Sequence, residues 1–200
     1  MTTFDDATGR HDRIPQDREL ARRMALLPHL GLSEDRPVPL FDALAENLAK
    51  EAADLVGQPA GFYAMVNIMK DGYQFFAGLY VPSGHGGESQ ASAPEAAPAD
   101  RIMPRTGGWC VHTLDRRKAL PLDDVFDYPR WLGNDAVTQL GARTYLGTPL
   151  IHQPTDTAIG TCCLVGQEVT RWKRQGVSLL KHYATQVLDN VAELPHHSPH

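Results

Sequence analysis

The stretch GARTYLGTPLIHQPTDTAIGTCCLV, which runs from Gly141 to Val165, decides the fold of this chain. It contains two runs, Thr144 to His152 and Thr157 to Val165, that are rich in Val, Ile, Thr, Tyr and Leu and are therefore typical of β-strands. The polar residues 153–156 between them have the length of a four-residue hairpin loop. Three residues within the runs fit a bulge or a close approach of two backbones: Gly147, Pro149 and Gly160. The stretch therefore predicts a hairpin at the centre of a sheet.

Length and charge restrict the class of protein. A chain of 200 residues is long enough for one domain of about 150 residues with tails. The net charge of -5 and the pI near 6.0 give no bulk attraction to nucleic acid or to an anionic membrane. No apolar run approaches the roughly 18 to 20 residues of a membrane-spanning helix, and the polar N-terminus lacks a signal core. We therefore expect a cytoplasmic protein with no nucleic-acid or membrane partner.

The chain has three cysteines, an odd number that argues against a disulfide framework and for reduced thiols. Cys162 and Cys163 are adjacent within a predicted strand, where successive side chains point to opposite faces. These two thiols therefore cannot easily serve one site.

The first third of the chain predicts an N-terminal extension and a long helix. Residues 1–38 form the extension, which we expect to be partly disordered, with a short helix over 17–27. Apolar residues then recur at steps of three and four from Phe41 to Val56, which predicts an amphipathic helix that ends near Gly57.

A second hairpin is predicted from two strand-like runs, 61–69 and 73–81. The following residues 82–100 are small, polar and proline-rich, so they predict a flexible insert within one domain spanning 39–194. A linker between two domains is the alternative, but neither half has enough strands to fold alone.

The remaining segments predict a short helix over 106–114, a brief strand over 119–122, an irregular helix over 129–140 and a long helix over 170–194. Thr170 is the expected cap of the last helix, and the tail 195–200 is expected to be disordered. Together these elements predict an α+β fold. Its antiparallel sheet has the two long helices on one face and irregular segments over the other.

Four segments occur in an order and spacing that one family shares. They are Trp109-Cys110-Val111 with Ala119 to Asp124, Asp127-Tyr128-Pro129, Leu146 to Leu150, and Ile159 to Val165. From about Phe41 to Leu194 the chain resembles bacterial members of the GAF domain family, a small-molecule-sensing module of phytochromes, phosphodiesterases and signalling proteins. The resemblance implies a central antiparallel sheet of five or six strands, with terminal helices behind it. In front it implies a ligand pocket roofed by residues 109–140.

The specialised chemistries of this family depend on residues that are mostly absent here. The region that would carry a bilin-binding cysteine, residues 131–139, has none, and the cyclic-nucleotide motif of the phosphodiesterases has no counterpart. Cys110 loosely matches the first cysteine of the free-methionine sulfoxide reductases. The second position holds residues such as Asn134 and Asp135, so the thiol pair that this redox chemistry needs is expected to be missing.

Aromatic and polar residues on the predicted roof and central hairpin are the candidate ligand-binding residues, because ligand sites combine apolar walls with a few polar groups. They are Trp109, Cys110, His112, Asp124, Phe126, Trp131, Arg143 and Tyr145. The alternative is that the aromatic rings simply fill the pocket. Arg143 could clamp an anion or lie on the surface, and the acidic cluster of Asp123, Asp124 and Asp127 is more typical of turns and caps than of catalysis.

Metal and haem sites have weak signals. Cys110 and His112 are two residues apart, but no further ligand pair has a useful spacing, so we expect no metal site. Non-covalent haem on His112 remains a third possibility beside sensor and enzyme.

The sequence thus predicts a stand-alone, non-enzymatic sensor or regulatory domain that binds an unidentified small molecule or a signalling protein. No catalytic residue or cofactor can be named. The apolar stripes of the two long helices could form a homodimer, unless the sheet covers them completely. The alternative function is a thiol-based redox enzyme that uses Cys110.

Overall fold

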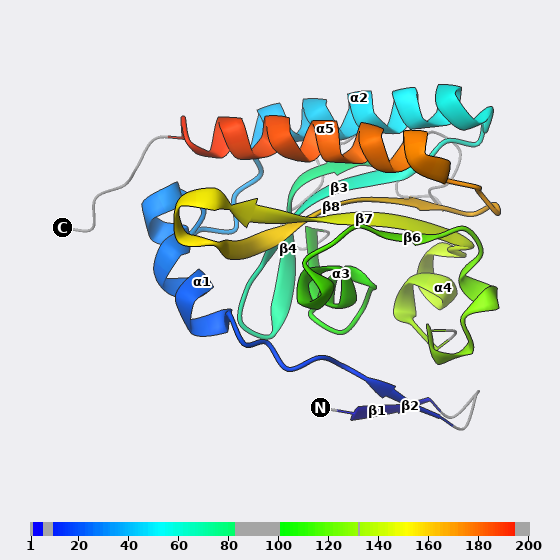
Figure 1. The fold of residues 1–200 in the computed structure, drawn as a ribbon, viewed down its shortest axis with the longest axis horizontal. Helices are drawn as coiled ribbons and strands as arrows, with labels where there is room; N and C mark the ends of the chain where they lie inside the picture. Colours follow the sequence, from blue (N-terminus) through cyan, green and yellow to red (C-terminus); the bar gives the residue numbers. More distant parts are fainter. Residues whose placement is uncertain (1, 6–9, 83–100, 132, 195–200) are drawn as a thin grey trace.

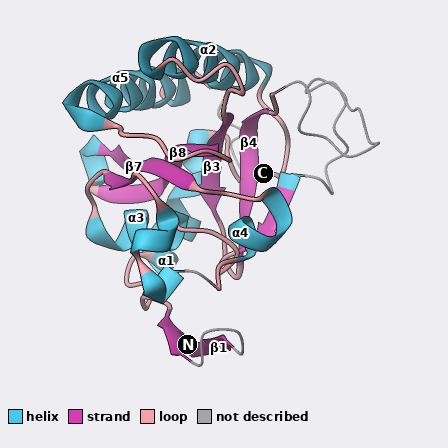
Figure 2. Ribbon diagram, turned by 90° about the vertical axis from the view of Figure 1, so that its right-hand side faces the viewer, coloured by secondary structure: helices cyan, strands magenta, loops and turns pink. Residues whose placement is uncertain are grey.

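The computed structural model describes residues 2–5, 10–82, 101–131 and 133–194 (Figure 1). Residues 83–100 of the predicted insert and the whole predicted tail lie outside this part of the chain. Six strands form one antiparallel sheet, which two long helices cover on one face and short helices cover on the other (Figure 2). This arrangement confirms the predicted α+β fold.

The strand order of the main sheet is β5-β4-β3-β8-β7-β6. The strands are β3 (Tyr63–Met69), β4 (Tyr73–Tyr80), β5 (Ile102–Pro104), β6 (Leu120–Leu122), β7 (Thr144–His152) and β8 (Thr157–Gly166). A separate pair, β1 (Thr2–Asp5) and β2 (Arg10–Arg13), forms a small two-stranded sheet that the sequence did not predict. Both strands of the predicted central hairpin, β7 and β8, have a neighbour on each side, so the prediction that they are inner strands is confirmed.

Strand β8 is buried on both faces, and its alternation sends Cys162 into the core behind the sheet and Cys163 into the core in front of it. The prediction that these cysteines face opposite ways is therefore confirmed. A Cβ atom at Gly160 would lie 1.8 Å from the backbone oxygen of Asn67 on β3, so only glycine allows the two strands to approach here.

The two long helices, α2 (Pro39–Val56) and α5 (Lys173–Val191), pack side by side behind the sheet (Figure 1). Their inner faces bury residues such as Phe41, Leu48 and Leu180 against the sheet. On α2 the large apolar side chains that remain exposed are Leu40 and Leu55. The sheet therefore covers most of both stripes, and the homodimer stays a prediction. None of the described helices is both long and apolar enough to cross a membrane.

The predicted cap of the last helix is wrong. Helix α5 begins at Lys173, and the Thr170 hydroxyl instead donates to Oε1 of Gln58, 2.8 Å away. The Trp172 backbone N–H donates to Oδ1 of Asp123 at 3.1 Å, which supplies the acceptor that a capping side chain would otherwise provide. A cap from another segment cannot be recognised by local spacing.

The layer in front of the sheet consists of α3 (Cys110–Arg116), two short 3-10 helices, η4 (Val125–Asp127) and η5 (Pro129–Trp131), and α4 (Asp135–Leu140). These elements replace the predicted helices over 106–114 and 129–140. The first helix starts later than predicted because Gly107 and Gly108 form the turn before it. A Cβ atom at Gly107 would lie 2.7 Å from the Met103 side chain.

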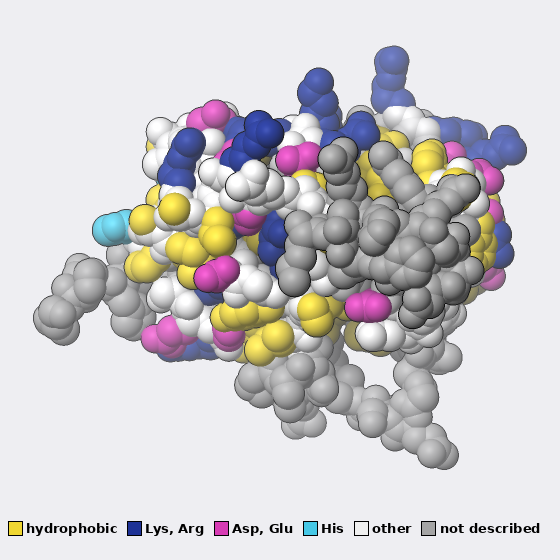
Figure 3. Space-filling view, turned by 90° about the horizontal axis from the view of Figure 1, so that it is seen from below, with side chains coloured by type: hydrophobic (Ala, Val, Ile, Leu, Met, Phe, Trp, Pro, Cys, Tyr) yellow, Lys and Arg dark blue, Asp and Glu magenta, His cyan; other side chains and the backbone are white. Residues whose placement is uncertain are grey.

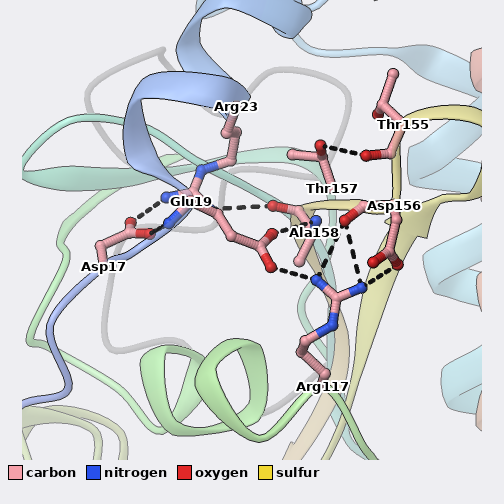
Figure 4. Close-up of polar contacts among 8 residues, drawn as sticks. All are labelled: Asp17, Glu19, Arg23, Arg117, Thr155, Asp156, Thr157 and Ala158. Atoms are coloured by element: carbon pink, nitrogen blue, oxygen red, sulfur yellow. Dashed lines mark hydrogen bonds and ion pairs between the residues drawn. The ribbon is translucent and has the colours of Figure 1, made fainter.

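Residues 14–38, which we expected to be an extension, pack against the body of the fold through α1 (Leu20–Leu26) and the 3-10 helix η1 (Leu27–Leu30). Arg23 is fully buried and donates to the backbone oxygens of Met69 and Ala158, each at 3.0 Å, and to Asp17. Figure 4 shows its contacts with Ala158 and Asp17. A buried cation that binds two carbonyls and a carboxylate fixes this segment to the sheet.

Two further buried cations bind segments that precede the main sheet in the sequence. Lys70 donates to the backbone oxygens of Leu32 and Ser33 at 2.6 and 2.9 Å. Arg101 forms an ion pair with Asp42 of α2 at 2.8 Å and also donates to a backbone oxygen of β4. The segment before the main sheet is therefore held by side chains whose polar ends lie inside the protein.

Candidate functional site

Aromatic side chains fill the space in front of the sheet. Trp109 and Tyr145 are each 1% exposed and Trp131 is 2% exposed. The rings of Trp109 and Tyr145 have centroids 5.3 Å apart and are tilted by 49°. This packing corresponds to the alternative that the sequence left open, in which the rings occupy the expected pocket.

Between α3 and the sheet lie four buried polar side chains that we call the thiol centre: Cys110, Thr113, Tyr145 and Cys163. The Cys110 and Cys163 sulfur atoms are 3.8 Å apart, and the Tyr145 hydroxyl donates to the Cys110 sulfur at 3.6 Å. The same hydroxyl lies 2.8 Å from Oγ1 of Thr113. All four residues are buried, so these contacts occur away from water.

Three elements build the thiol centre. Cys110 and Thr113 lie three residues apart on α3 and so share one face of the helix. On the sheet, Cys163 of β8 is directly opposite Gly147 of β7, and Tyr145 is two residues further along the same face. A Cβ atom at Gly147 would lie 2.0 Å from the Tyr145 hydroxyl oxygen, so this glycine makes room for the hydroxyl.

Next to the thiol centre are two buried polar side chains that lack part of their hydrogen bonding. Asn67 of β3 and Thr161 of β8 are register partners and are both 0% exposed. Asn67 donates to the side chain of Gln74, but among the described residues its Oδ1 atom and the Thr161 hydroxyl have no hydrogen-bond partner. Leaving such a group unpaired inside a protein costs about 1 to 3 kcal/mol.

The surroundings of the two cysteines in the thiol centre shift their pKa values in opposite directions. A hydrogen bond from Cys163 lowers the pKa of Cys110, and Thr161, Tyr145 and Asn67 add to this effect against the opposing effect of burial. The hydrogen bond to Cys110, together with burial, raises the pKa of Cys163 well above its usual value. Of the two thiols, Cys110 is therefore the one that loses its proton first, and its thiolate is the nucleophile.

Cys162, on the opposite face of β8, provides a prediction about pH. Burial raises its pKa to about 12, whereas an unfolded thiol titrates near pH 8.5. The stabilising effect of the protonated thiol is present below the unfolded pKa and is lost as the pH rises. As the pH rises from about 7.5 to about 10, Cys162 ionises in the unfolded state but not in the folded state. The free energy of unfolding should therefore fall by about 2 kcal/mol. Urea unfolding at both pH values should show that this alkaline loss is about 2 kcal/mol smaller in Cys162→Ala; equal losses in the variant and the wild type would refute the burial argument.

The other candidate residues do not join the thiol centre. His112 is half-buried beside Trp131, with ring centroids 5.6 Å apart. Arg143 forms an ion pair with Asp124 at 2.6 Å and lies 4.6 Å from the ring centroid of Phe126, which is 44% exposed. Of the eight predicted residues, Cys110 and Tyr145 thus belong to the thiol centre, and Trp109 packs against it. The others form a ring pair, His112 with Trp131, and a group at the surface, Asp124 with Phe126 and Arg143.

Asp124 also has the capping role that the sequence left as an alternative. Its Oδ1 atom accepts a hydrogen bond from the Phe126 backbone N–H at 3.0 Å, at the start of η4. The hydrogen bond from Arg143 lowers the pKa of Asp124, which keeps this carboxylate charged. The geometry gives it no nucleophile to assist.

The family's second cysteine position, near Asn134 and Asp135, carries no thiol, but a second thiol reaches Cys110 from another part of the chain. Cys163 supplies it from a strand that is 53 residues away in sequence, while Cys162 remains behind the sheet. Thr113, Asn67 and Thr161 also escaped the sequence analysis. The one available signal was the strand alternation, which places Cys163 on the same face as Tyr145.

Among the described residues no group of three or more His, Cys, Asp and Glu side chains could hold a metal ion. A cavity of about 190 Å³ lies at the edge of the front layer, between residues 16–19, Arg105 and α3. Seen from below (Figure 3), the surface that grey atoms leave visible mixes hydrophobic, acidic and basic side chains.

Comparison with known proteins gives a family and a fold. The family model of the GAF domain matches residues 40–188. No curated protein sequence is significantly similar to the chain.

Solved structures with a similar fold share little sequence with this chain. One is the type II free methionine-R-sulfoxide reductase from Thermoplasma acidophilum, with 12% identity and a TM-score of 0.51 over 77% of this chain and 96% of that one. Another is the GAF domain of an Acinetobacter phosphoenolpyruvate-protein phosphotransferase, with 11% identity and a TM-score of 0.52 over 90% and 96%. A third is the blue-light absorbing form of the Thermosynechococcus elongatus PixJ GAF domain, with 16% identity and a TM-score of 0.50 over 80% and 95%.

Proposed function

Because this chain belongs to the GAF domain family, we propose that it is a non-enzymatic sensory or regulatory domain of the cytoplasm. Its input site is the thiol centre with Asn67 and Thr161, and its output passes through α2 and α5 to a partner protein. The signal is a small molecule that enters the front layer or reacts there.

The observation that carries this proposal is the pair of incompletely satisfied polar groups in an otherwise closed core. Asn67 Oδ1 and Thr161 Oγ1 have no hydrogen-bond partner in the described part of the chain. Apolar side chains of similar shape would avoid the cost of these groups. Polar atoms that reduce stability inside a core are typical of functional sites, because a guest molecule can satisfy them.

Strand β7 connects the input site with the output helix. Tyr145 faces the thiol centre, whereas its neighbour Thr144 accepts a hydrogen bond at 2.9 Å from the Trp172 indole N–H at the start of α5. The residue after Tyr145, Leu146, belongs to the core that α5 covers. A movement of Tyr145 is therefore transmitted to α5 through adjacent residues of one strand.

Hydrogen exchange tests this connection. Tyr145→Phe removes the hydroxyl that bridges Cys110 and Thr113, so amide exchange in residues 172–187 is expected to change. Tyr73→Phe is the matched control, because its hydroxyl binds Asp35 away from the thiol centre. If residues 172–187 exchange as in the wild type in both variants, α5 does not report on the thiol centre and the proposed output is wrong.

A second candidate function is a thiol-based reductase, favoured by the 3.8 Å approach of Cys110 to Cys163. Burial of both sulfur atoms makes it the weaker candidate, because a substrate of amino-acid size must reach the thiolate. Reduction of methionine sulfoxide in the presence of dithiothreitol, abolished by Cys110→Ser, would establish the enzyme. The same slow background rate in both proteins would favour the sensor.

A further inference from the structure

We infer that Cys110 and Cys163 form a reversible disulfide when the protein meets hydrogen peroxide or an alkyl hydroperoxide. This inference rests on the proposed sensory function and specifies its signal as an oxidant. The two cysteines join the start of α3 to the middle of β8. The family match assigns this pair no role.

The first argument is the geometry of the two sulfur atoms. Both thiols are reduced and in contact at 3.8 Å, and a disulfide bond requires about 2.05 Å. The missing distance of about 2 Å can be closed from one side, because α3 has only seven residues and no side-chain cap at its start. Cys163, by contrast, is held in an inner strand of the sheet.

The second argument is the set of polar groups around Cys110. The Tyr145 hydroxyl already donates to its sulfur atom and stabilises a thiolate. The Thr161 hydroxyl is fully buried and lies close enough to Cys110 to lower its pKa, yet it forms no hydrogen bond within the described residues. It can therefore donate to a peroxide oxygen held against the Cys110 sulfur atom. Asn67 Oδ1 can accept a hydrogen bond from the peroxide O–H group. The closed core thus offers a donor and an acceptor next to the Cys110 sulfur atom.

The reaction proceeds in two steps. The Cys110 thiolate attacks one peroxide oxygen, the O–O bond breaks, and hydroxide or alkoxide leaves, which gives a sulfenic acid on Cys110. The Cys163 sulfur atom then attacks the Cys110 sulfur atom, the S–O bond breaks, and the departing hydroxide takes the Cys163 thiol proton as water. Two thiols are oxidised by two electrons, the peroxide is reduced, and a dithiol reductant restores the starting state.

Burial determines which oxidants react. Cys110 is 6% exposed and Cys163 is 1% exposed, so the reagent must enter while α3 opens briefly. Hydrogen peroxide is little larger than water and needs a smaller opening than glutathione disulfide does. The pair should therefore react faster with peroxide than with glutathione disulfide, in contrast to an exposed thiol pair.

Mass spectrometry of the full-length chain tests the inference. The protein is treated with hydrogen peroxide, the remaining thiols are alkylated in denaturant, and the chain is digested with trypsin. We expect peptide 106–116, which contains Cys110, to be joined to peptide 144–171, and dithiothreitol to separate them. The joined pair should weigh less than the two reduced peptides together by the mass of one hydrogen molecule.

Variants assign the bond, because Cys162 and Cys163 lie in the same tryptic peptide. Circular dichroism first verifies that each variant is folded, and Cys163→Ser replaces Cys163→Ala if the alanine variant is not. The joined peptides should persist in Cys162→Ala and disappear in Cys163→Ala. Their absence from the wild type, or their persistence without Cys163, would overturn the inference.

A second measurement separates this inference from the proposed function. Amide exchange of α5 is compared between the peroxide-treated and the reduced wild type. A disulfide with altered exchange in α5 supports both proposals. A disulfide with unaltered exchange in α5 supports the redox pair and contradicts the sensory output.

Discussion

Arg23→Ala is expected to destabilise the fold by about 3 to 5 kcal/mol, the typical cost of removing one partner from a buried ion pair. The Arg23 guanidinium is fully buried, and it binds Asp17 and the backbone oxygen of Ala158 (Figure 4) as well as the backbone oxygen of Met69. Alanine removes this donor from both backbone oxygens, leaves Asp17 with only Glu19 and Arg105 among the described residues, and leaves a void between α1 and the sheet. Equilibrium urea unfolding, followed by tryptophan fluorescence, measures the loss.

Arg22→Ala is the matched control, because Arg22 precedes Arg23 on the same helix and is exposed. Its free energy of unfolding should remain within about 0.5 kcal/mol of the wild type. Equal stability of Arg23→Ala and Arg22→Ala would mean that residues 14–38 are not part of the cooperative fold.

Trp109→Ala should have a similarly large effect, a loss of about 3 to 5 kcal/mol, because it removes a fully buried indole from the front layer. The void would lie against Tyr145, whose ring packs on Trp109. Free indole should restore part of the stability by binding in this void. Thermal unfolding with and without indole measures both effects.

Phe126→Ala serves as the control for an aromatic ring that belongs to the same set of predicted ligand residues but is 44% exposed. The free energy of unfolding of Phe126→Ala should be within about 1 kcal/mol of the wild-type value, and indole should not change it. If Trp109→Ala were as mild as Phe126→Ala, the front layer would be a loose roof rather than a packed core.

The main elements of the fold were predictable because their signals are local. The hairpin of β7 and β8 follows from two runs of strand-forming residues around a four-residue turn, and the end of α2 follows from Gly57, which adopts a left-handed conformation. The buried cations of the N-terminal segment were not predictable. Arg23 looks like any surface arginine in the sequence, and its partners Met69 and Ala158 are 46 and 135 residues away.

The candidate site was predicted only in part, for the same reason. Trp109, Cys110 and Tyr145 were recognised because they lie on the predicted roof and central hairpin. Cys110 and Tyr145 belong to the thiol centre, and Trp109 packs against Tyr145. Cys163 was dismissed because its neighbour Cys162 faces the other way, although that alternation is what brings Cys163 alone to Cys110. Contacts between a helix and a strand 53 residues apart depend on the packing of the whole front layer.

Carbon-13 NMR of the full-length chain labelled at cysteine Cβ tests most directly whether Cys110 and Cys163 form the reactive centre. Before treatment all three Cβ signals should lie in the range of reduced thiols. After hydrogen peroxide the signals of Cys110 and Cys163 should move together to the disulfide range, while the signal of Cys162 stays in place. Three unmoved signals, or a shift that includes Cys162, would contradict a sensing centre built from this pair.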